Sequence, residues 1–174
     1  MSSILIIYSS TDGQTLKICQ KLQAVIEQEH QVTVVSIDDL AQIDLTRFDK
    51  IVIGASIRYG HHSPQIVKFI KNNTRFLDSK PNAFFSVNVV ARKPAKNSPE
   101  TNPYLRKFLK RIAWKPKELA VFAGKIDYPA YKPFDRLVIR LIMWMTKGPT
   151  DPDAVVEYTD WNQVASFGDR LGKM

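Results

Sequence analysis

Short, continuously apolar runs alternate along the chain with longer stretches in which apolar residues recur every three or four positions. The apolar runs predict buried strands at 4–8, 32–35, 51–55, 83–90 and 119–124. The periodic stretches predict amphipathic helices at about 14–29, from Pro64, from 101–103 and after Asp160. Strands that are apolar on both faces need cover on both faces. The alternation therefore predicts an α/β fold in which a parallel sheet lies between two layers of helices.

Five strand–helix units of this kind favour a doubly wound sheet with the strand order 2-1-3-4-5. A ligand of such a sheet lies outside the carboxyl ends of the strands, beside the first and the third. The loops of interest are therefore those after Tyr8, Ala55, Val90 and Gly124.

One segment, at about 129–152, does not fit the alternation and forms a helical insertion after the fifth strand. Within it, 134–147 is expected to be a helix whose cations share one narrow stripe while its other sides are apolar. Such a helix either packs against the protein or lies in a membrane interface with its cations toward lipid headgroups, and a lid over the site is compatible with both. In a membrane interface, the contact residues are Arg136, Arg140, Trp144 and Lys147.

The composition suits one domain spanning 1–174, since 174 residues with 44% hydrophobic content supply a full-sized core. The lone cysteine, Cys19, lies on the first helical pattern, which predicts a packed thiol in a reducing compartment. No charged leader precedes the first strand, and no apolar run approaches the roughly 20 residues of a membrane span. A cytoplasmic protein, peripheral to a membrane at most, is expected.

The formal net charge of +8 is concentrated in one segment between Ala91 and Lys117, where nine cations stand against Glu100 alone. Such a patch indicates an anionic partner, which can be nucleic acid, acidic lipid or a polycarboxylate, unless it is only a solvated surface. The cations are Arg92, Lys93, Lys96, Arg106, Lys107, Lys110, Arg111, Lys115 and Lys117.

A hydroxyl-rich turn with one glycine connects the first strand to the first helix, and this arrangement directs N–H groups and hydroxyls at one point above the helix. It predicts a phosphate site, with an ordinary turn capped by Ser or Thr as the alternative. The turn contains neither G-x-x-x-x-G-K-S/T nor G-x-G-x-x-G, so the triphosphate loop and the dinucleotide fingerprint are excluded. The candidate residues are Ser9, Ser10, Thr11, Asp12, Gly13, Gln14 and Thr15.

The turn resembles the loop of the flavodoxin family that holds the phosphate of flavin mononucleotide (FMN), whose pattern T/S-x-T-G-x-T falls on 10–15. One position departs from the pattern, because Asp12 stands where the family has a threonine. A carboxylate aimed at a phosphate would repel it, so Asp12 is expected to turn outward or cap the helix and to contribute only its backbone N–H. The resemblance implies a flavodoxin-like three-layer sandwich with FMN as cofactor.

The same resemblance implies flavin contacts from two further loops. Tyr59 lies where flavodoxins place an aromatic residue against the flavin ring, and aromatic stacking suits such a ring. The implied contacts are Ser56, Ile57, Arg58, Tyr59 and Gly60, then Asn88, Val89, Val90, Ala91 and Arg92.

The second of these loops lacks the second stacking aromatic of many flavodoxins, which leaves one flavin face open to a large planar substrate. The cations placed to meet carboxylates of that substrate are Arg58, Arg92, Lys93 and Lys96. His61 and His62 are too few and too adjacent for a metal site, and they are either surface histidines or candidate catalytic proton acceptors.

The strings at 53–61 and 86–94, the basic insertion and the closing 158–161 together resemble the family of bacterial flavodoxin-like protoporphyrinogen oxidases. The resemblance implies a six-electron oxidation of protoporphyrinogen IX to protoporphyrin IX in haem biosynthesis, with FMN as cofactor and ubiquinone or menaquinone as acceptor. It also implies peripheral attachment to the cytoplasmic face of the inner membrane, where the partner is an anionic surface. The two propionates of the porphyrinogen agree with a basic rim.

Three other functions compete with this interpretation. A flavodoxin-type FMN electron carrier or a general quinone reductase would share the flavin loops, but carriers usually dock on an acidic rim, which this chain lacks. A nucleic-acid binder would explain the basic segment but neither the hydroxyl loop nor Tyr59. No nucleic-acid partner is therefore expected, and the pattern indicates no particular oligomeric state.

Overall fold

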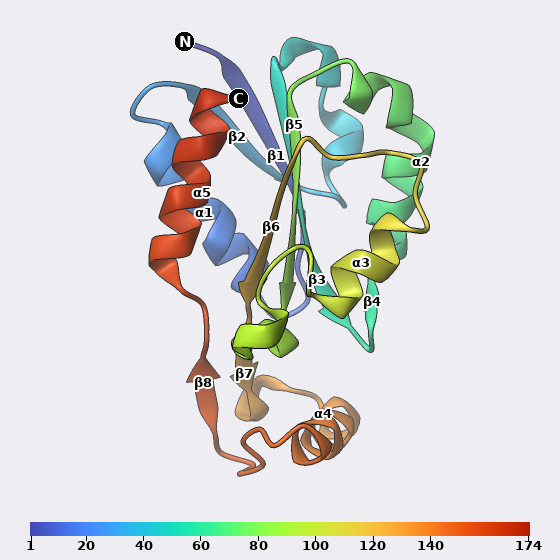
Figure 1. Ribbon diagram of the computed structural model, residues 1–174, viewed down its shortest axis with the longest axis vertical. Coiled ribbons are helices and arrows are strands. Elements are labelled where there is room, and N and C mark those ends of the chain that lie inside the picture. Colours follow the sequence, from blue (N-terminus) through green and yellow to red (C-terminus); the bar gives the residue numbers. More distant parts are fainter.

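The computed structural model describes residues 1–174, and its centre is a parallel sheet of five long strands (Figure 1). The strands lie in the order β2-β1-β3-β5-β6, which is the predicted 2-1-3-4-5 for the long strands. Their bounds are β1 Ser3–Ser9, β2 Gln31–Ser36, β3 Lys50–Arg58, β5 Asn82–Asn88 and β6 Glu118–Ala123.

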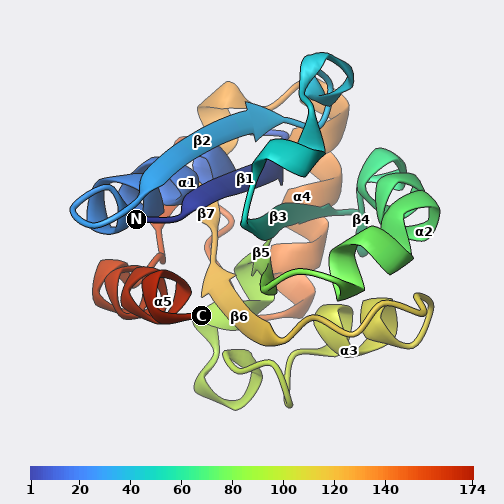
Figure 2. The same ribbon diagram turned by 90° about the horizontal axis from the view of Figure 1, so that it is seen from above.

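The alternation of side chains along β1 distributes the core over the two faces of the sheet. Ile4 and Ile6 pack with α1 (Gln14–Ile26) and α5 (Trp161–Lys173) on one face. Leu5 and Ile7 pack with α2 (Pro64–Asp78) and α3 (Pro103–Leu109) on the other. Figure 2 shows these helix pairs on opposite sides of the sheet. Cys19 of α1 is fully buried and burial raises the pKa of its thiol, so it is a packed residue as predicted.

Local sequence signals place the helix starts as expected. Ser63 caps α2 ahead of Pro64, Asn102 caps α3 ahead of Pro103, and Asp160 accepts from two N–H groups at the start of α5. The apolar spacing of Leu105, Phe108 and Ile112 indicates a longer third helix than the structure has. α3 ends at Leu109, and Ile112 is buried beyond its end.

The expected loop from Ser56 to His62 is instead a β-hairpin. β3 continues to Arg58, and β4 (His61–His62) pairs with it in antiparallel fashion. Tyr59 and Gly60 form the connection with φ values of 50° and 79°. Two central residues with positive φ make a tight turn that matches the twist of the strands it joins, and this turn extends β3 beyond its apolar run.

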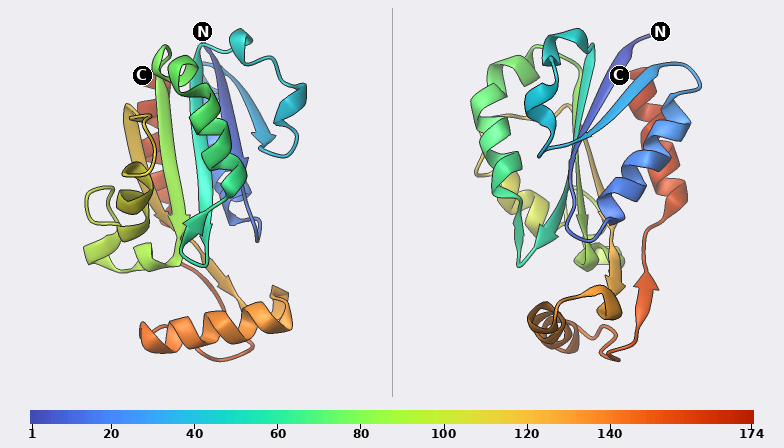
Figure 3. Two further views of the ribbon diagram at one scale, coloured as in Figure 1. Left: turned by 90° about the vertical axis from the view of Figure 1, so that its right-hand side faces the viewer. Right: turned by 180° about the vertical axis from the view of Figure 1, so that it is seen from behind.

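The insertion forms a small unit of its own beyond the carboxyl ends of the strands (Figures 1 and 3). Its helix, α4 (Pro133–Met145), agrees closely with the predicted 134–147. An antiparallel ribbon that the apolar pattern did not indicate joins it to the domain, made of β7 (Lys125–Asp127) and β8 (Val155–Glu157). A separate cluster of Ile126, Tyr128, Tyr131 and Met143 holds the unit together. None of the helices combines the length and hydropathy that crossing a membrane requires.

Candidate functional site

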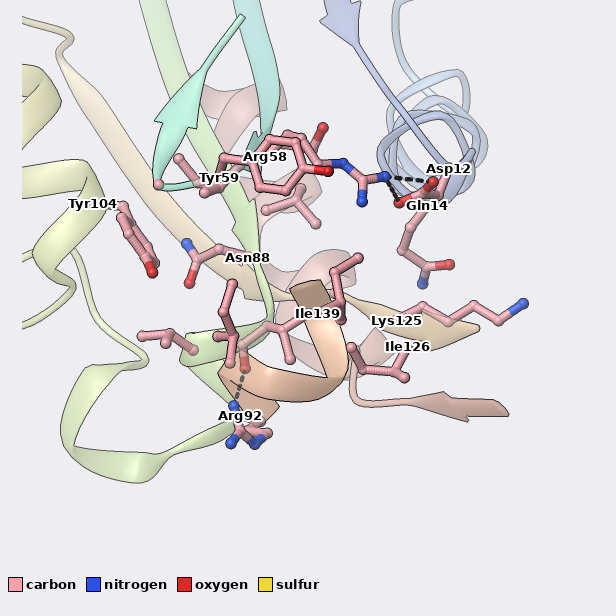
Figure 4. A pocket seen from close by; sticks show the side chains of 18 of the residues that line it. Asp12, Gln14, Arg58, Tyr59, Asn88, Arg92, Tyr104, Lys125, Ile126 and Ile139 are labelled. Atoms are coloured by element: carbon pink, nitrogen blue, oxygen red, sulfur yellow. Dashed lines mark hydrogen bonds and ion pairs between the residues drawn. The ribbon is translucent and has the colours of Figure 1, made fainter. Parts of the chain in front are cut away.

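A cavity opens at the carboxyl end of the sheet, between the β1–α1 turn, the β3–β4 hairpin and α4 (Figure 4). The predicted residues that line it are Ser10, Asp12, Gln14, Thr15, Ser56, Ile57, Arg58, Tyr59, Gly60, Asn88, Val89, Val90 and Arg92. The lining residues that the prediction missed are Val87, Tyr104, Gly124, Lys125, Ile126, Tyr131, Ile139, Ile142, Met143 and Thr146. Most of the missed residues belong to α3, the ribbon and α4, whose positions follow from tertiary packing.

Four of the predicted cofactor residues do not line the cavity. Ser9 is the last residue of β1, and Thr11 is exposed in the turn. Gly13 donates its N–H to the Ser10 hydroxyl at 3.0 Å. Ala91 is buried in a short 3-10 turn and donates its N–H to the Asn88 side chain at 3.1 Å.

The start of α1 has the features of an anion site. Gly13 precedes the helix with a φ of 89°, no side chain caps the helix, and its first turn contains no acidic residue. The hydroxyl of Thr15, a fully buried residue, has no partner within the protein. Buried polar groups are almost always paired, so an unpaired hydroxyl beside free N–H groups fits a phosphate. The N-cap residue is Gly13, so the alternative of Ser or Thr as N-cap of this helix is wrong.

Asp12 does not oppose an anion at this turn, because its carboxylate is bound elsewhere. One guanidinium nitrogen of Arg58 lies 2.6 and 2.7 Å from its two oxygens. The same guanidinium lies 5.5 Å from the ring centroid of Tyr131. Asp12 is therefore turned toward the hairpin, as its departure from the flavodoxin pattern requires.

The contacts of the cations correct the predicted carboxylate ligands. Arg58 is paired with Asp12, while Arg92 donates to the carbonyl of Thr146 at 3.1 Å and to that of Val89 at 3.2 Å. Arg92 thus satisfies a carbonyl just after the end of α4, a group that lacks a partner within the helix. Neither Lys93 nor Lys96 lines the cavity. The charge of Arg58 is thus balanced by Asp12, and the guanidinium of Arg92 is held by two carbonyls of the protein.

Two tyrosines from different elements face the cavity (Figure 4). Tyr59 is 47% exposed at the tip of the hairpin, and its hydroxyl donates to the carboxylate of Asp135 on α4. That hydrogen bond raises the pKa of Tyr59. Tyr104 of α3 also lines the cavity, although the loop after β5 contributes no aromatic residue, as its sequence indicates. The second aromatic arrives from a distant helix and not from the loop after β5.

The inner side of α4 forms an apolar wall of the cavity through Ile139, Ile142 and Met143. These side chains bound the cavity on the side of the insertion. Arg136 donates to the carbonyl of Tyr128 at 3.0 Å, and Arg140 donates to that of Thr150 at 2.8 Å. These two arginines thus fasten α4 to its own unit, and their role as membrane contacts stays a prediction.

The two adjacent histidines differ in environment, and neither lines the cavity. His61 is exposed, whereas His62 is buried with its Nε2 2.9 Å from the Ser86 hydroxyl and its ring centroid 4.6 Å from that of Phe108. Burial, and secondly His61, lowers the pKa of His62 to about 4. His62 is therefore neutral and structural at physiological pH, and the geometry does not support either histidine as the proton acceptor.

This burial predicts a pH-dependent stability. Since the pKa of His62 is about 4 in the folded protein and 6.5 in a free side chain, the unfolded chain binds the extra proton between these values. The contribution of His62 to the free energy of unfolding is fully present above pH 6.5. It falls by up to about 3 kcal/mol as the pH drops toward 4. Urea midpoints measured across this range should show the loss in the wild type and a flatter profile in His62→Gln. Parallel profiles would contradict the assignment.

A doubly wound sheet, an uncapped helix start beside a buried hydroxyl and a tyrosine over the same cavity define a flavin-binding protein of the flavodoxin class. The family model described as flavodoxin domain matches residues 5–153. Two oxidised flavodoxins of Bacillus cereus, with 17% and 16% identity, superpose with TM-scores of 0.55 and 0.56, cover 99% of this chain, and are themselves covered to 98% and 99%. These structures agree with the fold.

Curated relatives narrow the family further. The chain is 43% identical to the protoporphyrinogen IX dehydrogenase (quinone) of Escherichia coli K12 over 98% of this chain and 94% of the relative. It is also 43% identical to the protein of that name from Leishmania major, over 94% of this chain and 71% of the relative. The chain belongs to the flavodoxin domain family and, within it, to the family of these oxidoreductases.

Proposed function

We propose that this chain oxidises protoporphyrinogen IX to protoporphyrin IX, with FMN as cofactor and ubiquinone or menaquinone as acceptor, as a step of haem biosynthesis. The observation that carries the proposal is the apolar wall of Ile139, Ile142 and Met143, which faces the phosphate turn and Tyr59 across one cavity. A flavin site closed by an apolar helix suits a hydrophobic, planar substrate. The 43% identity to dehydrogenases of that name supports the same substrate pair.

The residues present fit FMN. Its phosphate would bind the N–H groups at the start of α1 and the hydroxyls of Ser10 and Thr15, and its ring would lie against Tyr59. The other members of the predicted set that line the cavity complete the cofactor contacts. When bound, FMN supplies a two-electron acceptor, so six electrons need three cycles.

The chain itself contributes binding, orientation and exclusion of water. Six electrons and six protons leave the porphyrinogen and reduce three quinones to quinols. Within the cavity Arg58, Arg92 and Lys125 are cationic and already bound by acceptors of the protein. The carboxylate in the lining, Asp12, is paired with Arg58, so protons that do not travel with the electrons leave through water at the mouth, and formation of the quinols takes up the same number. The wall from α4 keeps the remaining solvent out.

We place the protein on the cytoplasmic face of the inner membrane, through the outer side of α4. There Phe134, Leu137 and Trp144 are 71, 66 and 71% exposed, and Leu141 and Met145 are 55 and 64% exposed. Monomeric proteins rarely expose so continuous an apolar strip. Lys132 and Lys147 are exposed at the two ends of α4 and suit acidic headgroups. This contact would bring the cavity close to membrane quinones.

Replacing Phe134, Leu137 and Leu141 together by serine should weaken binding to vesicles about 100-fold, because three exposed side chains lose apolar contact with lipid. Co-sedimentation with vesicles that contain phosphatidylglycerol measures the change. Val155→Ser is the control, since Val155 is 55% exposed but lies on β8. Equal binding of both variants would contradict the membrane face.

Anaerobic turnover tests the activity. FMN-loaded protein with protoporphyrinogen IX and a short-chain ubiquinone or menaquinone should produce porphyrin fluorescence well above the autoxidation control. A rate equal to that control would contradict the proposal. Quinone reduction with other donors would then indicate a general quinone reductase, and flavin that exchanges electrons with neither substrate would indicate an electron carrier.

A further inference from the structure

Each cation inside the cavity is already engaged by an acceptor of the protein. Arg58 lies on Asp12, Arg92 donates to the carbonyl of Thr146, and Lys125 lies 2.9 Å from Asp127. These are the lysine and arginine side chains of the lining. Cations that no acceptor of the protein engages have to come from beside the cavity.

A groove that shares its wall with the cavity offers them. It runs between α2 and α3, which cover the same face of the sheet (Figure 2), and the tip of the β3–β4 hairpin lies at one end. Gly60 and Tyr104 line both the cavity and this groove. A molecule that lies over Tyr59 can therefore extend past Tyr104 into the groove.

The groove is cationic without any acidic neighbour in its lining. Its cations are Lys68, Lys71, Lys107 and Arg111, with the exposed His61 at the hairpin. All four cationic side chains are exposed, and none forms an ion pair or a side-chain hydrogen bond within the protein. The floor is made of Val67, Phe108 and His62, which is neutral above its pKa of about 4.

Four unpaired cations on one concave surface repel one another, which costs stability in the free protein. By contrast, Arg170 on α5 lies 3.4 Å from Glu118. A bound dianion would remove the repulsion and gain charge-assisted hydrogen bonds. The hydrophobic floor and the shared aromatic wall suit a carboxylate on an apolar scaffold better than a free phosphate.

We propose that this groove binds the two propionate carboxylates of the tetrapyrrole and so orients its ring in the flavin cavity. The inference rests on the proposed function and names the part of the site that selects a dicarboxylate. Lys107 and Arg111 of the α3 segment line the part of the groove that contains Tyr104, and in this proposal they make the principal contacts with the carboxylates. Lys68 and Lys71 add positive charge along α2.

The test uses two double variants with the same change of charge. Lys107→Gln with Arg111→Gln removes groove cations, whereas Arg106→Gln with Lys110→Gln removes exposed neighbours on the same segment that do not line the groove. For the FMN-loaded protein, the groove variant should raise KM for protoporphyrinogen IX about tenfold with kcat within about twofold. The neighbour variant should leave both constants within about twofold.

A binding readout separates this inference from the proposed activity. The dissociation constant of protoporphyrin IX should rise about tenfold in the groove variant, and the constant of its dimethyl ester should not change. Added NaCl should shrink the difference between acid and ester. Equal effects of both double variants, or an equal loss for acid and ester, would overturn the groove assignment even if the enzyme turns over. Acid-selective binding without turnover would overturn the proposed oxidation and support the groove.

An acidic lipid surface is the competing occupant of the same cations. If it occupied the groove, the groove variant would lose binding to vesicles with phosphatidylglycerol while the porphyrin constants in detergent-free buffer stayed unchanged. That pair of results would overturn the propionate assignment.

Discussion

Replacing Thr15 by valine is expected to weaken FMN binding about 30-fold while stabilising the flavin-free protein. Thr15 is fully buried, and its hydroxyl lacks a partner within the protein. Valine keeps the shape and removes the unpaired hydroxyl, which should raise the free energy of unfolding of the flavin-free protein by about 1 kcal/mol. With FMN bound, the lost hydrogen bond to a charged phosphate costs about 2 kcal/mol.

Titration of FMN fluorescence measures the affinity, and urea unfolding of the flavin-free protein measures the stability. Thr11→Val is the matched control, because Thr11 is exposed in the same turn and does not line the cavity. It should change neither quantity appreciably. An unchanged FMN affinity in the Thr15 variant, or a loss of stability in its flavin-free form, would contradict a phosphate site at the start of α1. The opposite signs of the two effects distinguish a ligand residue from a simple packing residue.

The largest effect on stability is expected from Gly54→Ala in the middle of β3. Gly54 lies beside Phe85 of β5 in the sheet register, and a Cβ atom there would stand 2.1 Å from the ring Cζ and 2.6 Å from both Cε atoms. Phe85 is fully buried and packs on Phe122 and Phe167 at centroid distances of 5.6 and 6.2 Å. The ring has no room to move, so the variant should lose about 3 kcal/mol of unfolding free energy.

Two comparisons isolate the clash. Gly124→Ala should change stability by less than about 1 kcal/mol, because the atoms nearest to its added Cβ would lie 3.6 to 3.8 Å away, which is ordinary contact. In a Phe85→Leu background the Gly54→Ala substitution should cost about half as much, since the ring that it meets is gone. Thermal or urea unfolding measures all three. Additive losses in the double variant would show that the cost comes from the backbone and not from Phe85.

The fold was predictable because its signals are local. Apolar runs longer than a turn determine the strands, and caps such as Ser63 with Pro64 and Asp160 determine where helices begin. The uncapped turn before α1 was recognisable for the same reason, since its hydroxyls and Gly13 lie within seven residues of one another. The loop after Ala55 was misjudged as irregular, because pairing with β4 decides that Ser56 to Arg58 remain a strand.

The roles of the charged residues were not predictable from composition. Arg58 and Arg92 lie in loops that line the cavity. Their guanidinium groups nevertheless donate to Asp12, 46 residues away, and to the carbonyl of Thr146, 54 residues away. Whether a cation is free for a ligand depends on which acceptors reach it in three dimensions. The stripe of Arg136 and Arg140 was located correctly, but only packing shows that it faces the unit of the insertion.

The sequence by itself predicted the parallel sheet and the helix of the insertion, which the structure confirms. It also predicted that the turn before α1 and Tyr59 belong to one site, and residues of both line the cavity. These follow from periodicity and from neighbours along the chain. Only the tertiary structure decided that Tyr104 and α4 close the cavity, that Asp12 and Thr146 hold its arginines, and that cations without ion pairs gather between α2 and α3. The physical reason is that charge pairing and cavity closure depend on contacts between segments distant in sequence, and no local pattern records them.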